Sequence, residues 1–258
     1  MALIALACYS TEENKKDECL AKTLKSLDET VNFKKHRLIL SVNGATEVTK
    51  RIIHNNRDII SKVFWNDENL GTAEAINLCW KLRKEGEHAI KCDDDFVVHS
   101  SGWVDEMEET VEVNPSIGQV GLKRKDCIET PYHNDPYFRS ELIQLQHIPG
   151  HNWIIVERAH HVMGTCVLHS SALLDKVGYL LQPHLYGYDD VLMSARSRGA
   201  GFINCFLPHI KIDHIDEGTT PYQTWKERHA GQYAPMIGDL MQKYIKGEDI
   251  YYNPFIEK

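Results

Sequence analysis

Three consecutive aspartates, Asp93, Asp94 and Asp95, lie between two apolar segments of the sequence. The flanking residues, 89–92 and 96–98, are short runs of the kind that form buried strands. Carboxylates in such a place repel one another and lose hydration unless a cation compensates them. A hard divalent ion, Mg²⁺ or Mn²⁺, held by one or two carboxylates and substrate phosphates, is the natural compensation. The triplet therefore predicts a divalent-metal site, with a solvated acidic loop as the alternative.

The segments that lead to the triplet alternate between strand-like and helix-like patterns. Apolar runs typical of buried parallel strands are separated by segments with the period of an amphipathic helix. The strand-like runs cover residues 3–8, 37–43, 62–65 and 88–92, and the helical patterns cover 20–31, 50–60 and 71–85. This order predicts an α/β fold with a doubly wound, mostly parallel sheet flanked by helices.

The polar loops of this half each begin where a predicted strand ends. They are Tyr9-Ser10-Thr11, Asn43-Gly44, residues 66–71 and the aspartate triplet. Ligands of doubly wound sheets bind outside the carboxyl ends of the strands. We therefore expect these four loops to meet in one site.

The second half of the chain is less regular. Residues 123–148 show no clear period and contain several prolines and aromatic residues, which is typical of a long functional loop. Strands are expected at 117–122, 153–157, 162–168, 202–207 and 210–214, and helices at 102–113, at 170–177, up to residue 199 and beyond residue 222.

Five further segments, in order along the chain, resemble motifs of the GT-A fold glycosyltransferases of the family-2 type. Together with the triplet, the resemblance covers about residues 3–216. The matching segments are 66–71 with Ala73, Ala75 and Asn77, then 114–121, 163–178, Tyr186-Gly187-Tyr188-Asp189-Asp190 with Arg196 and Gly199, and Pro208 with His214.

The resemblance implies a role for each matched residue. Asp95 and His214 would hold the metal, Asp190 would be the general base, and Asp189 would help to orient the acceptor. From the chemistry, Arg196 or Arg198 could add a donor near the pyrophosphate, with a solvated helix face as the alternative. The nucleotide-sugar side would comprise Tyr9, Ser10, Asn43, Asn69, Gly71, Asp93, Asp94 and Arg196.

Two segments depart from the family's pattern. The turn after the second strand is aspartate-rich in the family, but it is Ser41-Val42-Asn43-Gly44 here. Asn pairs with more than one base edge, so the base of the nucleotide stays open. The acid pair is Asp189-Asp190 rather than Glu-Asp, so either carboxylate can be the base.

The activity implied by the resemblance is metal-dependent transfer of a sugar, with inversion, from a nucleoside-diphosphate sugar to a hydroxyl. A UDP-sugar is the favoured donor. Bound Mn²⁺ or Mg²⁺ would neutralise charge on the departing pyrophosphate, and a carboxylate would take the acceptor's proton. The acceptor would be a glycan or a hydroxymethylated base of phage-type DNA, contacted by the basic clusters at 34–37 and 123–125.

The same resemblance suggests a division of the chain into one domain and a tail. Residues 1–221 would form the glycosyltransferase domain, with a nucleotide-binding half (1–100) and an acceptor and catalytic half (101–221). Residues 222–258 would form a helical tail packed on it.

Two other functions stay open from the sequence. A nucleotidyltransferase also places metal-binding acids on an α/β sheet, but it normally carries a glycine-rich loop after the first strand, and residues 7–13 contain no glycine. A non-catalytic nucleotide-sugar-binding module would keep the fold without the reaction.

Composition narrows the class of protein further. The chain has 29 Lys and Arg against 37 Asp and Glu, a net charge of −8, which argues against a dedicated nucleic-acid binder. Its seven cysteines form no CxxC pair, which favours reduced thiols over a zinc site. We expect a cytoplasmic protein, in a bacterial or phage-infected cytosol, without membrane insertion.

Overall fold

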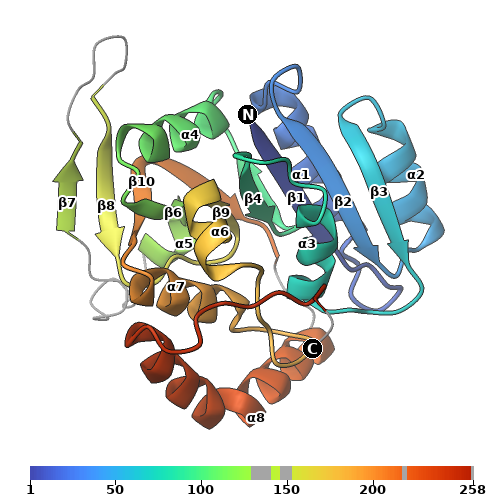
Figure 1. Cartoon of the computed structure of the whole chain (residues 1–258). Coiled ribbons are helices and arrows are strands. Elements are labelled where there is room, and N and C mark those ends of the chain that lie inside the picture. Colours follow the sequence, from blue (N-terminus) through green and yellow to red (C-terminus); the bar gives the residue numbers. More distant parts are fainter. Residues whose placement is uncertain (129–140, 146–152, 217–219, 257–258) are drawn as a thin grey trace.

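A twisted sheet of ten strands forms the centre of the described structure, with helices on both faces (Figure 1). The computed structural model describes residues 1–128, 141–145, 153–216 and 220–256. The strands are β1 (Ala2–Cys8), β2 (Arg37–Asn43), β3 (Ile60–Asn66), β4 (His88–Cys92), β5 (Phe96–Val98), β6 (Ile117–Arg124), β7 (Glu141–Gln144), β8 (Ile155–Ala159), β9 (Cys166–His169) and β10 (Ile203–His214). The helices are α1 (Asp17–Thr30), α2 (Glu47–Asn55), α3 (Thr72–Trp80), α4 (Trp103–Val113), α5 (Lys125–Ile128), α6 (Ser171–Val177), α7 (Asp189–Gly199) and α8 (Thr220–Ile245).

The strand order is β3-β2-β1-β4-β9-β6-β10-β8-β7, and β5 pairs with β10. Strands β3, β2, β1 and β4 are parallel, as the sequence predicts. The second half is mixed, because β9 runs antiparallel to both β4 and β6. Hydrophobic periodicity reports the type of an element but not its direction, so the mostly parallel sheet that we expected holds only for the first half.

Successive side chains of the central strands point to opposite faces of the sheet. Ile4 and Leu6 of β1 pack with α1, α2 and α4 on one face. Leu3 and Ala5 pack with α3, α6 and α7 on the other. The resulting three layers leave only the strand ends free to carry polar groups, which is why the polar loops lie at the edge of the sheet.

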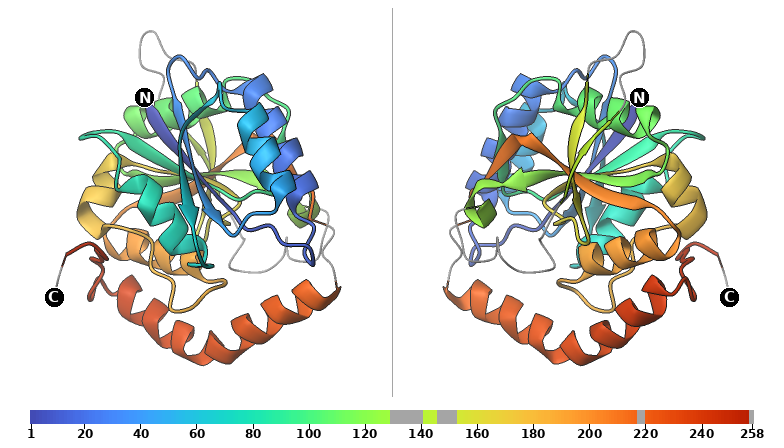
Figure 2. Two further views of the ribbon diagram at one scale, coloured as in Figure 1. Left: turned by 90° about the vertical axis from the view of Figure 1, so that its right-hand side faces the viewer. Right: turned by 90° about the vertical axis from the view of Figure 1, so that its left-hand side faces the viewer.

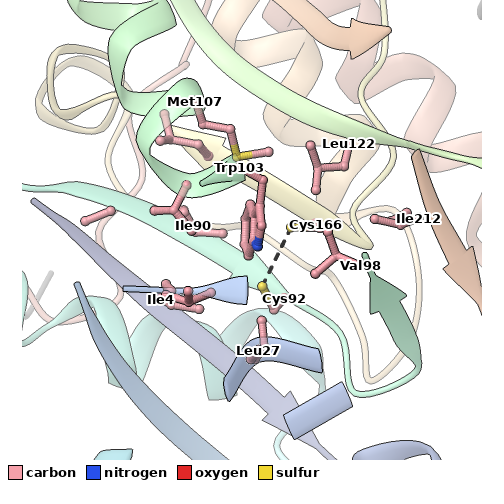
Figure 3. Close-up of a cluster of buried hydrophobic side chains, with 14 of the residues drawn as sticks. Ile4, Leu27, Ile90, Cys92, Val98, Trp103, Met107, Leu122, Cys166 and Ile212 are labelled. Atoms are coloured by element: carbon pink, nitrogen blue, oxygen red, sulfur yellow. Dashed lines mark hydrogen bonds between the residues drawn. The ribbon is translucent and has the colours of Figure 1, made fainter. Parts of the chain in front are cut away.

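The strand that carries the triplet is anchored in the larger of these two clusters (Figure 3). Cys92, the last residue of β4, lies opposite Cys166 of β9, with the two sulfur atoms 3.9 Å apart. The indole of Trp103 lies beside this pair in Figure 3 and is fully buried. Asp93 therefore follows directly from the rigid interior of the sheet. All six cysteines whose side chains are described are free thiols.

Several boundaries differ from the sequence expectation. The helix predicted over residues 71–85 ends at Trp80. The two runs predicted at 202–207 and 210–214 form one strand, β10, with a register shift between Leu207 and Lys211, around Pro208. Proline has no N–H to donate to a neighbouring strand, which explains the shift. Within the region predicted as a long loop, residues 141–144 form β7, while 129–140 and 146–152 lie outside the described residues.

Helix α8 crosses the base of the molecule beneath α7 (Figure 2). Its Ile237 and Tyr244 pack against Leu192 and Ala195 of α7. Gly199 makes this contact possible, because a Cβ there would lie 1.8 Å from the carbonyl oxygen of Tyr244. None of the helices in the described part of the chain is long and apolar enough to cross a membrane.

Arg196 ties α7 to the chain that surrounds it rather than to a ligand. Its guanidinium is fully buried and donates to the carbonyl oxygens of Tyr179 and Ile250, each at 2.7 Å, and to that of Val177. Burial lowers the pKa of Arg196 to about 10. The expectation that Arg196 faces the pyrophosphate therefore needs correction, since its donors are used to hold the loop after α6 and the segment after α8.

We predict that Arg196→Gln lowers the free energy of unfolding by about 3 kcal/mol, because three buried carbonyl oxygens lose a charged donor. Urea denaturation measures this, and nucleotide affinity of the folded variant should stay within about twofold of the wild type. Arg198→Gln, on the same helix but only partly buried, is the matched control. Unchanged stability together with lost nucleotide affinity would contradict the structural role.

Candidate functional site

A cavity of about 300 Å³ opens at the carboxyl ends of β1, β2 and β4. Loops from both halves of the chain contribute to its walls. The predicted residues that line it are Tyr9, Asn43, Asn69, Gly71, Asp93, Asp94, Asp95, Asp189, Asp190 and His214. Of the predicted set, Ser10 and Arg196 are absent from the lining of this cavity. The sheet therefore gathers the two acidic motifs, almost 100 residues apart in sequence, around one space.

Asp93 and Asp94 are held by different partners. Lys91 Nζ donates to Asp93 Oδ1 at 3.0 Å, and the backbone N–H of Tyr9 donates to Asp94 Oδ2 at 3.3 Å. Burial and the charge of Asp95 raise the pKa of Asp94 to about 8, and burial raises the pKa of Asp93 to about 6. Both shifts run in the direction that burial of a carboxylate produces, and for Asp94 the neighbouring Asp95 charge adds to it.

Asp95 lies between a lysine and an imidazole. Its Oδ2 accepts a hydrogen bond from Lys16 Nζ at 2.9 Å and lies 3.6 Å from His214 Nε2. Burial alone would raise the pKa of Asp95, but His214 and Lys16 outweigh burial and hold it well below its usual range. Asp95 Oδ1 is buried and has no hydrogen-bond partner among the described residues. An unpaired carboxylate oxygen beside an imidazole is a donor set that fits Mn²⁺ or Mg²⁺.

A second group of possible metal ligands lies at the opposite end of the sheet, where β1 and β2 begin. His36, Asp105 and Glu108 place ligand atoms within 4.8 Å of one another. Lys35 Nζ already lies 2.5 Å from Asp105 Oδ1 and 3.0 Å from Glu108 Oε2. His36 Nδ1 accepts from the backbone N–H of Ala2 at 3.2 Å, which leaves the proton of the neutral ring on Nε2. These contacts fit a structural ion cluster better than a metal site.

The wall formed by β2 and the loop before α3 is joined by amide hydrogen bonds. Asn43 donates through Nδ2 to the carbonyl of Gly71 at 3.1 Å and accepts through Oδ1 from Asn66 at 2.9 Å. Asn69 Oδ1 accepts from the backbone N–H of Gly71 at 3.0 Å. Gly71 has a φ of +79°, and a Cβ there would lie 3.1 Å from the backbone of Leu185. Asn43 and Asn69 therefore shape this wall, and Gly71 lets the chain pass close to Leu185.

Tyr9 and Ser10, at the end of β1, lie in different surroundings. Tyr9 lines the cavity, and its ring packs beside Gly44, where a Cβ would lie 3.4 Å from the Tyr9 ring. Ser10 is buried, and its Oγ has no hydrogen-bond partner among the described residues. The structure thus brings Tyr9 into the lining of the cavity but not Ser10.

Lys91 connects the two acidic motifs. Its ammonium is buried, lies 3.0 Å from Asp93 Oδ1 and 3.2 Å from Asp189 Oδ2, and donates to the carbonyl of Gly164 at 2.8 Å. Burial would lower the pKa of Lys91, but Asp189 and Asp93 outweigh it and raise the pKa above its usual range. Lys91 thus stays charged and fixes the distance between the triplet and the acid pair.

Asp190 is oriented by three contacts and still faces the cavity. The backbone N–H of Gly164 donates to Oδ2 at 2.9 Å, and His161 Nε2 lies 3.2 Å from the same oxygen. The backbone N–H of Val191 donates to Oδ1 at 2.8 Å. Burial opposes ionisation, but His161 outweighs it and holds the pKa of Asp190 below its usual range. Tyr188, with a φ of +67°, turns the chain into α7 at this point.

Four residues of the site escape sequence reasoning: Lys16, Lys91, His161 and Asp216. For Lys91 a signal exists, because a lysine in the middle of a buried strand requires an acidic partner. Lys16 pairs with Asp95 across 79 positions of sequence, which no local pattern reveals. His161 and Asp216 lie near predicted motifs without belonging to them.

The basic clusters that suggested DNA contacts are largely neutralised within the chain. Lys123 lies 2.5 Å from Glu157, Lys125 lies 2.6 Å from Asp213, and Arg124 pairs with Asp126. In the other cluster, Lys35 pairs with Asp105 and Glu108, and Arg37 pairs with Glu87. Paired cations release few counterions on binding a polyanion, so these clusters give a DNA acceptor no support.

Comparison with known proteins shows a shared fold. No family model matches the sequence, and no curated protein matches it either. Among solved structures, the mannosyltransferase PcManGT from Pyrobaculum calidifontis, in complex with GDP-Man and Mn²⁺, has a TM-score of 0.68 at 14% identity. That match covers 96% of this chain and 68% of the other.

Two further structures are similar at the same level. S. aureus TarS 1-349 in complex with UDP has a TM-score of 0.64 at 13% identity, covering 96% of this chain and 67% of that fragment. GalNAc-T7 with UDP, GalNAc and Mn²⁺ has a TM-score of 0.58 at 14% identity, covering 83% of this chain and 44% of that one. At these identities the likeness concerns the fold: this chain has the GT-A fold of glycosyltransferases.

Proposed function

We propose that the chain is a metal-dependent glycosyltransferase that moves a sugar, with inversion, from a nucleoside-diphosphate sugar to an acceptor hydroxyl. The observation that carries this proposal is that one cavity is lined both by Asp95 and His214 and by Asp189 and Asp190. A site with a cation position and a separate carboxylate has the two groups that such a transfer requires.

A UDP-sugar is our proposed donor. Two of the similar structures contain UDP and one contains GDP-Man, so the fold accommodates both. In this chain Tyr9 and Asn43 would border the nucleoside, and Asp93 would lie near the ribose. Asn69 and Gly71 also line the cavity and would contact the nucleotide sugar.

The cation, Mn²⁺ or Mg²⁺, would be held by Asp95 and His214. When bound, it supplies positive charge that stabilises the departing diphosphate. The protein's own part is to keep the Asp95 carboxylate ionised, which His214 and Lys16 achieve against burial. Tyr186, which also lines the cavity, stays protonated because burial and the nearby Asp93 raise its pKa to about 12, so it remains a hydrogen-bond donor.

Asp190 is our proposed general base. Its side chain keeps 24% of its surface exposed, against 7% for Asp189, so it can meet an incoming hydroxyl. Asp189 is held against Lys91 and would orient the acceptor side of the site. We propose a glycan as the acceptor, since the basic clusters give DNA no support, and the cytosol as the compartment, in keeping with the free thiols.

We predict that Asp95→Asn abolishes metal-dependent nucleotide binding. Ligand binding to the native state raises the melting temperature, so UDP with Mn²⁺ should stabilise the wild type and fail to stabilise the variant. Asp105→Asn, in the ion cluster at the far end of the sheet, should keep the stabilisation. Equal stabilisation of the Asp95 variant and the wild type would remove Asp95 from the metal site.

For the acid pair, Asp190→Asn should lower kcat by about 10²- to 10⁴-fold and leave donor affinity intact, because only proton transfer is lost. Asp189→Asn should act mainly through KM for the acceptor. Initial rates of nucleoside-diphosphate release at varied acceptor concentration separate these effects. If Asp189→Asn loses kcat and Asp190→Asn does not, the two roles are reversed.

His161→Gln should change the pH dependence of kcat. The base acts only as a carboxylate, and His161 holds the pKa of Asp190 below its ordinary value of 3.8. Wild-type kcat should therefore persist at acidic pH, whereas in the variant the pKa rises and the acidic loss of kcat begins at higher pH. An acidic limb that does not move would show that His161 does not tune the base.

A further inference from the structure

Lys16 lies between β1 and α1 and reaches into the cavity beside the triplet. It is only 4% exposed, which is unusual for a lysine and requires anionic partners. Its Nζ lies 2.9 Å from Asp95 Oδ2 and 2.5 Å from Asp216 Oδ2. Two carboxylates from distant parts of the chain thus converge on one ammonium group.

Asp216 follows β10 and lies two residues beyond His214. Its Oδ2 also contacts Lys226 Nζ of α8 at 3.0 Å. Asp95 and Asp216 come together through a shared cation, and the imidazole of His214 lies 3.6 Å from the same Asp95 oxygen. The ammonium of Lys16 therefore lies between the two carboxylates, and the His214 imidazole lies beside Asp95.

An independent observation points to a further cation at this place. Asp95 is 93% buried, and its Oδ1 has no hydrogen-bond partner among the described residues, although Oδ2 is bonded to Lys16. A buried carboxylate oxygen normally has a partner, because leaving it unpaired costs the desolvation of a charged group. One ammonium thus satisfies only half of the Asp95 carboxylate, and a divalent ion that engaged the whole carboxylate would have to take Oδ2 from Lys16.

We propose that Lys16 is an internal counter-ion of the cation site, that a divalent metal binds by displacing it from Asp95 and Asp216, and that Asp216 then serves as a metal ligand. This inference rests on the metal role in the proposed function and adds a competitor and a ligand to it. An ammonium and a divalent ion repel each other, so they do not share the same carboxylate oxygens.

Displacement of Lys16 from the two carboxylates would also affect binding of the nucleotide sugar. Once displaced, the buried Lys16 ammonium needs a new anionic partner, since an unpaired charge in such a place is costly. Lys16 lines the cavity that we propose for the nucleotide, so the phosphates of a bound nucleoside diphosphate would be available as its new partner. Metal and nucleotide should therefore strengthen each other's binding, and this coupling should depend on Lys16.

The test is a titration of Mn²⁺ into the full chain, followed by the loss of the free-ion signal in electron paramagnetic resonance, with and without UDP. Lys16→Met removes the charge and keeps the length of the side chain. It should bind Mn²⁺ alone about tenfold more tightly than the wild type, and UDP should improve its Mn²⁺ affinity less. Lys22→Met, an exposed lysine on α1, is the matched control and should behave as the wild type.

Asp216 is tested in the background that lacks the Lys16 ammonium and keeps the contact of Asp216 with Lys226. Adding Asp216→Asn to Lys16→Met should weaken Mn²⁺ binding by about tenfold, because one ligand is lost. Lys16→Gln, with melting temperature as a check of folding, serves if the methionine variant does not fold. Each of these comparisons reads metal affinity directly and does not require turnover.

The outcomes separate this inference from the proposed function. Equal or weaker Mn²⁺ affinity in both Lys16 variants, with Asp95-dependent binding in the wild type, would overturn the counter-ion role and leave the metal site standing. An unchanged affinity on adding Asp216→Asn would remove Asp216 as a ligand. Failure of the wild type and of all variants to bind Mn²⁺ would overturn the metal role itself.

Discussion

Repulsion among carboxylates at the carboxyl edge of the sheet is the constraint that the surrounding structure satisfies. Asp93, Asp94 and Asp95 approach Asp189 and Asp190 around one cavity, where burial removes the water that would screen them. Two buried lysines compensate this charge within the protein. Lys91 binds Asp93 and Asp189, and Lys16 binds Asp95. The pKa of Asp94 is nevertheless raised, first by burial and then by the charge of Asp95.

The scaffold places these charges accurately because each is attached to a rigid element. The triplet follows β4, whose end is paired with β9 and packed under Trp103 (Figure 3). The acid pair begins α7. Arg196, on the same helix, donates hydrogen bonds to three carbonyl oxygens of the surrounding chain and so holds α7 in place. Helix α8 supports α7 from outside (Figure 2). Groups that must act together on one substrate are thus held by packing rather than by flexible loops.

Sequence reasoning predicts the parts of this arrangement that have a local signature. Buried parallel strands are continuous apolar runs, so β1, β2 and β4 and the polar loops after them can be located in advance. No local pattern in the sequence shows that β9 runs antiparallel to its neighbours, because the direction of a strand depends on how the preceding segment crosses the sheet. Arg196 matches a family motif, yet its side chain lies in the interior of the protein. A motif specifies the type of a residue but not which groups its side chain contacts. Lys16 finds its acid 79 positions away.

The central claim is that Asp95 and His214 hold a divalent cation in the cavity that also takes the nucleotide. A crystal structure of the chain with Mn²⁺ and UDP, with anomalous data that locate manganese, tests this most directly. The account predicts an anomalous peak within coordination distance of Asp95 and His214, with the diphosphate of UDP beside it. Manganese bound instead at His36, Asp105 and Glu108, or UDP outside the cavity, would contradict it.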